Sequence, residues 1–112
     1  MPTAMGGLTG PQIRTLRERL LAERERIGRV LAGAGEGREG EREPELEEAA
    51  QREAERTAGL EVADRERALL AEVERALAKL DAGTYGIGER SGRPIRYERL
   101  LAVPWARDDV GA

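Results

Sequence analysis

The side chains that could do chemistry in this sequence are carboxylates, and many of them lie in one glutamate-rich stretch. Residues 33–56 contain nine glutamates and only four arginines. Carboxylate oxygens are ligands that Mg²⁺ and Ca²⁺ prefer, but these glutamates follow no regular ligand spacing. Solvation, together with the positive end of a helix that begins here, is a sufficient explanation for such acidity. The stretch therefore offers negative charge rather than a defined cation site.

The residues needed for most other site chemistry are absent. The chain has no histidine and no cysteine, which excludes the familiar nucleophile–base pairs, disulfides and tetrahedral zinc sites. The segment 86–92, GIGERSG, lacks the lysine and the spacing of a phosphate-binding loop. The segment 33–40, GAGEGREG, follows a helical pattern rather than a strand, so it is not a dinucleotide fingerprint. We therefore predict a protein that is not an enzyme and holds no metal or other cofactor.

Length and composition favour long helices over a thick globular core. The 112 residues allow one domain, and 37% of them are charged. The bias toward Ala, Leu, Glu and Arg is typical of long helices or coiled coils. A net charge of −3 does not favour nucleic acid as a partner, and no apolar run approaches the ~20 residues that cross a bilayer. The start of the chain lacks the features of a secretion signal, so we expect a cytoplasmic protein.

Two helices of unequal length are expected after a disordered N-terminus, residues 1–8. Thr9 and Gln12 fit a capping box for a helix over residues 11–32, in which Leu16, Leu20 and Ile27 continue an apolar stripe. The glycine-rich residues 33–44 then predict a mobile turn at the tip. A second helix follows over residues 45–82, and Gly83 is suited to close it. Residues 9–82 therefore predict an antiparallel coiled-coil hairpin.

The remaining residues, 83–112, predict a small globular end, here called the base. Ile87 and Ile95 are candidates for two short paired strands, and the Ser91 hydroxyl for capping the following turn. The candidate core residues of the base are Tyr85, Ile87, Ile95, Tyr97, Leu100, Leu101, Val103 and Trp105. Such residues at the end of a hairpin are more often core than the lining of a ligand pocket.

The order of parts over residues 80–106 resembles the C-terminal half of the DksA/TraR family. The shared parts are a long helix, the sequence LDAGTYG, a CxxCG-like position at residues 88–92 and a short helical piece ending at Pro104. The resemblance implies a zinc-knuckle module, with its four zinc ligands at Gly88, Ser91, Asp109 and Ala112. None of these is Cys or His, so we expect the zinc-knuckle fold without zinc, with Trp105 supplying bulk near the metal's position.

The resemblance also implies a function. Members of this family are regulators that bind bacterial RNA polymerase through its secondary channel, with an acidic DxxDxA pattern at the hairpin tip. Counting back from the turn at Gly86 places Glu45, Glu48 and Ala50 on that pattern. Arg65 matches one basic position that some members use with the alarmone ppGpp. Glu72 and Val103 fall on other such positions, and an additional N-terminal helix is missing, so we expect no ppGpp response in the usual form.

Three interpretations remain open. The leading one is a monomeric regulator of initiation or catalysis by RNA polymerase that contacts no membrane and reads no DNA sequence. The second is a Gre-type factor that stimulates transcript cleavage or relieves backtracking. The third is a coiled-coil adaptor or self-associating protein unrelated to polymerase. The base arginines either meet the acidic rim of the polymerase or form a solvated surface: Arg90, Arg93, Arg96, Arg99 and Arg107.

Overall fold

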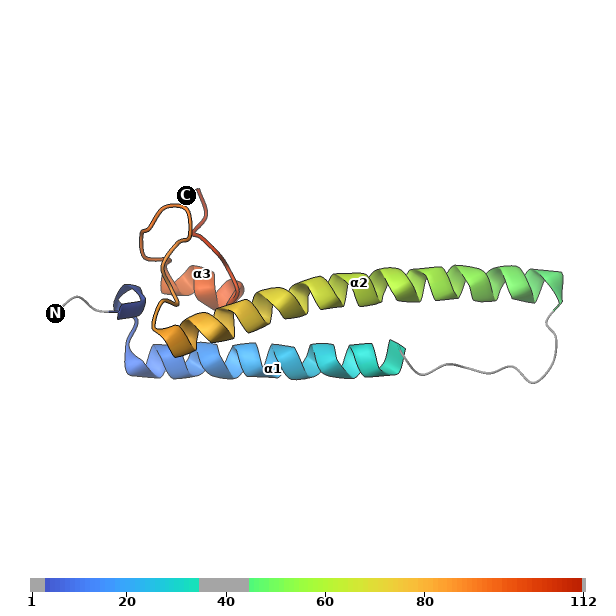
Figure 1. The fold of residues 1–112 in the computed structure, drawn as a ribbon, viewed down its shortest axis with the longest axis horizontal. Helices are drawn as coiled ribbons and strands as arrows, with labels where there is room; N and C mark the ends of the chain where they lie inside the picture. Colours follow the sequence, from blue (N-terminus) through green and yellow to red (C-terminus); the bar gives the residue numbers. More distant parts are fainter. Residues whose placement is uncertain (1–3, 35–44, 112) are drawn as a thin grey trace.

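The protein is a long helical hairpin with a small base at one end. The computed structural model describes residues 4–34 and 45–111. Its elements are η1 (Ala4–Gly7), α1 (Gly10–Ala34), α2 (Leu46–Ala82) and α3 (Tyr97–Ala102). Figure 1 shows α1 and α2 side by side, with α3 and the C-terminal loops packed where α1 begins and α2 ends. The principal dimensions are 69 × 26 × 20 Å, and the prediction of a mainly helical hairpin is confirmed.

The helix ends follow local signals that the sequence already displays. The Thr9 amide donates to Oε1 of Gln12 at 2.9 Å, and the Gln12 amide donates to Oγ1 of Thr9 at 3.2 Å, which completes the expected capping box. At the C-terminal end of α2, which lies at the same end of the hairpin, Gly83 adopts a left-handed conformation with φ of 78°. Its amide donates to the Leu80 carbonyl and so closes α2.

Two boundaries differ from the sequence-based expectation. Residues 1–8 were expected to be disordered, whereas the structure describes the short helix η1 and buries Leu8, which is 8% exposed. The reason is that Leu8 joins the apolar cluster that the base shares with α1. At the expected tip, α1 continues through Ala34, and the rest of that segment, 35–44, lies outside the described residues.

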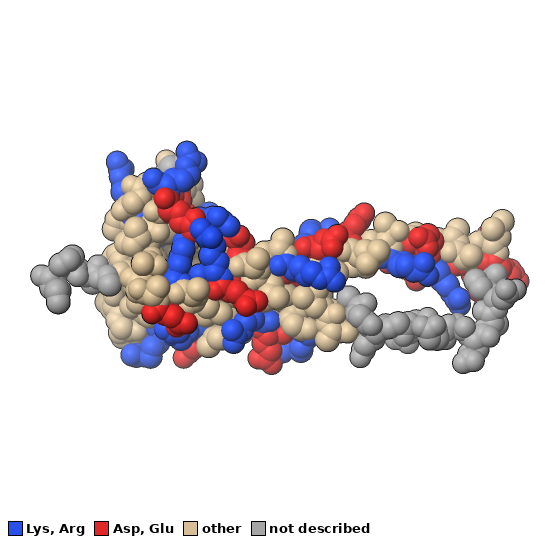
Figure 2. Space-filling view, in the orientation of Figure 1, with Lys and Arg blue, Asp and Glu red and all other residues tan. Residues whose placement is uncertain are grey.

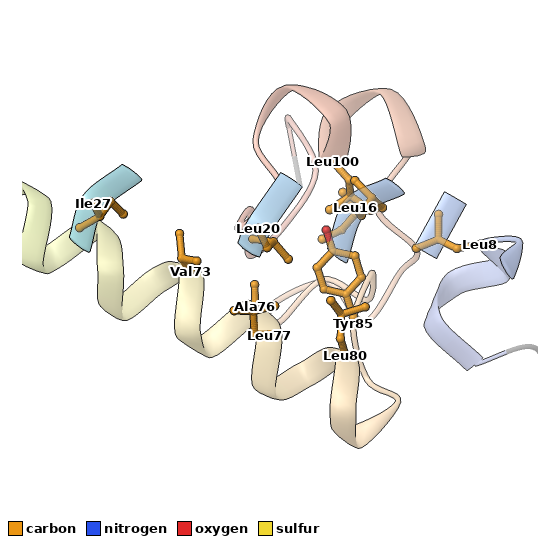
Figure 3. Close-up of a cluster of buried hydrophobic side chains, with 11 residues drawn as sticks. Leu8, Leu16, Leu20, Ile27, Val73, Ala76, Leu77, Leu80, Tyr85 and Leu100 are labelled. Carbon is orange, nitrogen blue, oxygen red and sulfur yellow. The ribbon is translucent and has the colours of Figure 1, made fainter. Parts of the chain in front are cut away.

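The core lies in the basal half of the hairpin and continues into the base. Leu16, Leu20 and Ile27 of α1 and Val73 of α2 are fully buried between the two helices (Figure 3). Each such side chain contributes about 1.5–3 kcal/mol through removal of apolar surface from water. The same cluster continues toward the base through Leu77, Leu80, Tyr85, Ile95 and Leu100. Packing therefore fixes the base on the end of the hairpin.

The other end of α2 has no such packing. Residues 46–62, here called the distal segment, are exposed except for Glu48, which is half-buried. Leu46 is 87% exposed and Leu60 is 58% exposed, in contrast to the buried leucines of the basal half. Among the described residues, the ion pairs that join α1 to α2, Arg17 with Asp81 and Arg26 with Glu66, both lie in the basal half. None of the described helices is both long and apolar enough to span a membrane.

Candidate functional site

The residues predicted for the tip gather at the first turn of α2. Glu45 is the N-cap residue, with an extended backbone and no capping hydrogen bond from its side chain. Glu48 lies three residues further on, in the first turn, so the two carboxylates project from the same side of the helix end. Ala50 follows Glu48 by two residues and is exposed. The positive end of the helix dipole stabilises carboxylates at this position.

Negative charge extends along the whole distal segment. Residues 45–62 contain six glutamates and two arginines. Arg56 pairs with Glu53 at 2.9 Å along the helix, and both side chains are more than half exposed. Figure 2 shows acidic and basic side chains along α2 on the face in view. In the part of the chain that the structure describes, no three or more Asp or Glu residues form a group that could hold a metal ion.

Arg65 lies far from the tip carboxylates. It follows Glu45 by twenty residues, which is about 30 Å along the helix. Its side chain is exposed and forms no hydrogen bond or ion pair with the described residues. The structure therefore places the predicted base contact on the middle of α2 as a free cation.

The base is built on one β-bridge and one buried tyrosine. Ile87 pairs with Pro94 rather than with Ile95, and the Ile95 amide donates to the Gly86 carbonyl at 2.8 Å. The expected pairing is thus offset by one residue, since Ile95 turns into the core and is 4% exposed. The Tyr85 hydroxyl donates to the Pro104 carbonyl at 2.8 Å, and burial raises its pKa. This bond ties the turn after α2 to the C-terminal segment.

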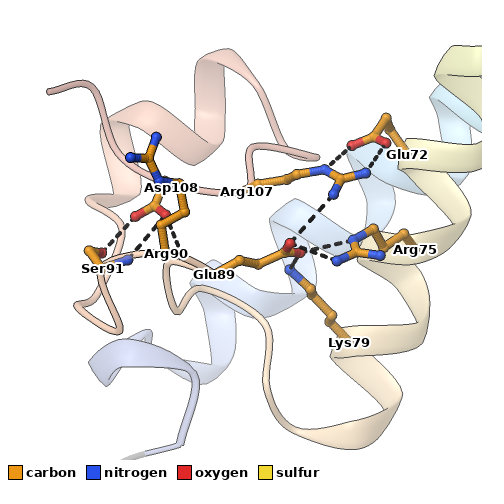
Figure 4. Close-up of polar contacts among 8 residues, drawn as sticks. All are labelled: Glu72, Arg75, Lys79, Glu89, Arg90, Ser91, Arg107 and Asp108. Carbon is orange, nitrogen blue, oxygen red and sulfur yellow. Dashed lines mark hydrogen bonds and ion pairs between the residues drawn. The ribbon is translucent and has the colours of Figure 1, made fainter. Parts of the chain in front are cut away.

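Glu89 is the centre of an ion-pair network between the base and α2 (Figure 4). Arg75 donates to its two carboxylate oxygens at 2.8 and 2.6 Å, and Lys79 donates to one of them. Arg107 approaches the same carboxylate to 3.5 Å. The hydrogen bonds from Arg75 and Lys79 lower the pKa of Glu89 to about 2. The network therefore holds the loop that carries Glu89 against α2.

The five base arginines divide into two groups. Arg107 is paired with Glu72, and Arg96 is paired with Asp109. The side chains of the other three form no hydrogen bond or ion pair with described residues: Arg90, Arg93 and Arg99. Arg90 and Arg93 are exposed, so they are free to meet an anionic surface. Arg99 is half-buried, and its Nε atom is buried without a partner.

The predicted ligand positions do not form a metal site among the described residues. Gly88 has no donor atom, and the Ser91 hydroxyl donates to Oδ1 of Asp108 at 2.6 Å. Both carboxylate oxygens of Asp109 accept hydrogen bonds from Arg96, which lowers the pKa of Asp109. The fourth position, Ala112, lies outside the described residues.

Asp108, which the sequence analysis did not single out, occupies the middle of this arrangement. The atoms nearest to the position of a Cβ on Gly88 belong to Asp108 and Ser91, and not to Trp105, which packs half-buried against the core. At Gly88, therefore, Asp108 and Ser91 fill the space closest to the expected ligand position. The expected role of Ser91 is confirmed, because its hydroxyl accepts a hydrogen bond from the Arg93 amide at 3.2 Å.

Comparison with known proteins assigns this architecture to a family. The transcription factor DksA of Caulobacter vibrioides, described as RNA polymerase-binding, is 33% identical over 103 residues, covering 90% of this chain and 72% of that protein. The chain belongs to the DksA/TraR family. The structure of the transcription factor DksA2 from Pseudomonas aeruginosa superposes with a TM-score of 0.78 at 33% identity, covering 90% of this chain and 79% of that one. No protein-family model matches the sequence.

Another relative matches only part of the chain. General stress protein 16O of Bacillus subtilis is 57% identical over 47 residues, which are 42% of this chain. That segment is 29% of the Bacillus protein, so the chain matches less than a third of that relative's length.

The zinc that the family resemblance implies does not fit the described side chains at the expected ligand positions. Gly88 has no side chain, and Ser91 and Asp109 are engaged in hydrogen bonds.

Proposed function

We propose that this protein is a non-enzymatic transcription regulator that binds bacterial RNA polymerase and acts through its secondary channel. The choice of partner rests on the name of the Caulobacter relative and on membership of the family. We further propose that it acts in the cytoplasm as a monomer, without reading DNA sequence. Its effect would be a change in the stability of the open complex or in catalysis by the polymerase.

The distal segment of α2 is the observation that carries this proposal. It is an exposed helix whose side chains do not pack into the hairpin core, about 25 Å long. It ends in Glu45 and Glu48, and carboxylates there can interact with Mg²⁺ or with cationic elements around a polymerase active centre. A narrow projection with an acidic end suits entry into a channel, whereas a broad surface would not.

The base supplies a second region for contact. Arg90 and Arg93 have exposed guanidinium groups that no described residue neutralises. Such groups can donate paired hydrogen bonds to carboxylates of an acidic protein surface, and they add to the rate of encounter. Arg96 and Arg107 are excluded from this role because their guanidinium groups hold the base together.

The first experiment measures binding to the polymerase separately from the effect on transcription. We would measure polymerase binding and promoter-dependent transcription for Glu45→Ala/Glu48→Ala and for a matched variant, Glu61→Ala/Glu74→Ala. The second pair removes the same charge from exposed positions elsewhere on α2. We expect the first variant to bind but lose the transcriptional effect, and the second to retain both. Equal loss of effect in both variants, or no binding by the unmodified protein, would contradict the proposal.

Two further assays distinguish the alternatives. Cleavage-stimulating factors use tip carboxylates to help hold a second Mg²⁺ that activates water. We expect no stimulated transcript cleavage on stalled polymerase complexes, and stimulation would move the assignment to a Gre-type factor. Sedimentation is expected to give a monomer; a tight dimer through the distal segment would favour the adaptor.

A further inference from the structure

Position 88 has no room for a side chain. A Cβ atom on Gly88 would lie 2.0 Å from Oδ1 of Asp108, 2.7 Å from its Cγ and 2.5 Å from Oγ of Ser91. Distances under 3.0 Å are essentially never seen for real Cβ atoms. Gly88 is not among the residues with a left-handed backbone, so its conformation would accept another residue. The obstacle is therefore the carboxylate of Asp108 and not the backbone.

The loop after α2 holds the Asp108 carboxylate in place through hydrogen bonds (Figure 4). Oδ1 of Asp108 accepts a hydrogen bond from the Ser91 hydroxyl at 2.6 Å, and Oδ2 accepts from the amides of Arg90 at 2.7 Å and Ser91 at 3.4 Å. The Ser91 hydroxyl also accepts from the Arg93 amide, so its position is fixed from both sides. One side chain thereby joins the loop after α2 to the C-terminal segment.

We propose that Asp108 performs in this base the cross-linking role that a metal ion performs in a zinc knuckle. A zinc ion joins two chain segments through four side chains and contributes directly to folding. Here a carboxylate clasp, defined as Asp108 with the Ser91 hydroxyl and the amides of Arg90 and Ser91, joins the same two segments. Gly88 belongs to this device because the carboxylate occupies the space that a ligand side chain at position 88 would need.

The clasp and a metal site exclude one another. A ligand at position 88 would displace the Asp108 carboxylate, and a metal bound by Ser91 would take the hydroxyl away from it. Asp109 would have to release Arg96, whose guanidinium donates to both of its oxygens at 2.9 and 3.1 Å. The loss of the cysteines is therefore compensated by a different set of bonds, in which neither a thiol nor a metal takes part.

A double-mutant cycle tests the coupling between Gly88 and Asp108. Hydrogen exchange of the Arg90 and Ser91 amides is measured in the unmodified protein, in Gly88→Ala, in Asp108→Ala and in the double variant. Loss of the carboxylate removes the acceptor of both amides, so exchange in Asp108→Ala is about tenfold faster. Gly88→Ala gives a similar increase because its Cβ displaces the carboxylate. The double variant exchanges no faster than Asp108→Ala, since the clash with the carboxylate no longer exists and the Ser91 hydroxyl, the other close neighbour, is no longer held by that carboxylate.

Controls make each result decisive. Asp81→Ala removes an exposed carboxylate elsewhere and leaves these two amides unchanged. Circular dichroism checks that the hairpin is intact, and Asp108→Asn, which keeps the shape of the side chain but loses its charge, serves if Asp108→Ala does not fold. Unchanged exchange in both Asp108 variants, or a Gly88→Ala effect that is equally large without Asp108, would overturn the proposal. Binding of one equivalent of Zn²⁺ by the unmodified protein, measured by calorimetry, would also overturn it.

Discussion

Arg107 in the C-terminal segment donates two hydrogen bonds, of 2.8 and 2.5 Å, to the carboxylate of Glu72 on α2. The two residues are 35 positions apart in the sequence, so this pair holds a distant segment against the hairpin. The same hydrogen bonds lower the pKa of Glu72. The family resemblance puts Glu72 at a position where some members have a basic residue for ppGpp. In this chain the Glu72 carboxylate instead pairs with Arg107 and holds the base in place.

The pair makes a small but measurable contribution to stability. Its side chains are 50% and 30% exposed, so solvent weakens the attraction and we expect only a weak coupling between the two residues. In a cycle of Glu72→Gln, Arg107→Gln and the double variant, each single change should lower Tm by a few degrees, roughly 4 °C. The double variant should lose less than the sum. Full additivity in the measured unfolding free energies would show that the two side chains do not interact.

Acid should loosen the base through Glu89. Its pKa is about 2 in the folded protein, compared with an ordinary value of 4.5. Because folding lowers this pKa, the stability that Glu89 contributes is complete above pH about 4.5 and is lost as the pH falls toward 2. We expect Glu89→Gln to have a lower Tm than the unmodified protein at pH 7 and a smaller difference near pH 2. Two parallel Tm curves across this range would contradict the role assigned to the carboxylate.

Much of the fold was predictable because its signals are local. The capping box at Thr9 and Gln12, the glycine at position 83 and the spacing of Leu16, Leu20 and Ile27 each depend on neighbours within a few turns. The helix boundaries accordingly agree within two residues with the observed α1 and α2. The unequal lengths of the two helices were also predicted, and the exposed distal segment belongs to the longer one.

The contacts that organise the base were missed because they are non-local. Glu89 forms ion pairs with Arg75 and Lys79 across the turn that ends α2. A single sequence does not indicate which of its many charged side chains will form pairs in the folded protein. For Asp108 a signal was present: a glycine at one expected ligand position, and an additional acidic residue beside the expected ligand Asp109. The missing step was geometric, since it required knowing that a side chain at Gly88 would collide with the neighbouring carboxylate.

Replacing a buried leucine of the hairpin with alanine should lower the free energy of unfolding much more than replacing an exposed one. Leu20 is fully buried between α1 and α2, whereas Leu60 in the distal segment is 58% exposed. We expect Leu20→Ala to lower the free energy of unfolding by about 2–5 kcal/mol, and Leu60→Ala to change it by less than about 0.5 kcal/mol. Urea unfolding followed by circular dichroism measures both. A similar loss from Leu60→Ala would mean that the distal segment packs against something in solution.

Two of the glycines inside the long helices, Gly28 and Gly59, provide the last prediction. A Cβ atom on Gly28 of α1 or on Gly59 of α2 would meet nothing within 4 Å, so alanine fits at both positions. Alanine is favoured over glycine inside a helix by about 1 kcal/mol. Gly28 lies next to the fully buried Ile27, and its replacement should therefore raise the free energy of global unfolding.

Gly59 lies in the exposed distal segment, which can open without the core. Gly59→Ala should therefore slow hydrogen exchange of amides in residues 46–62 about fivefold while raising Tm less than Gly28→Ala does. Mass spectrometry of peptides from the two halves of α2 would measure this difference. Equal Tm gains with unchanged exchange in the distal segment would show that α2 unfolds as one unit with the core, and that its acidic end is no more mobile than its base.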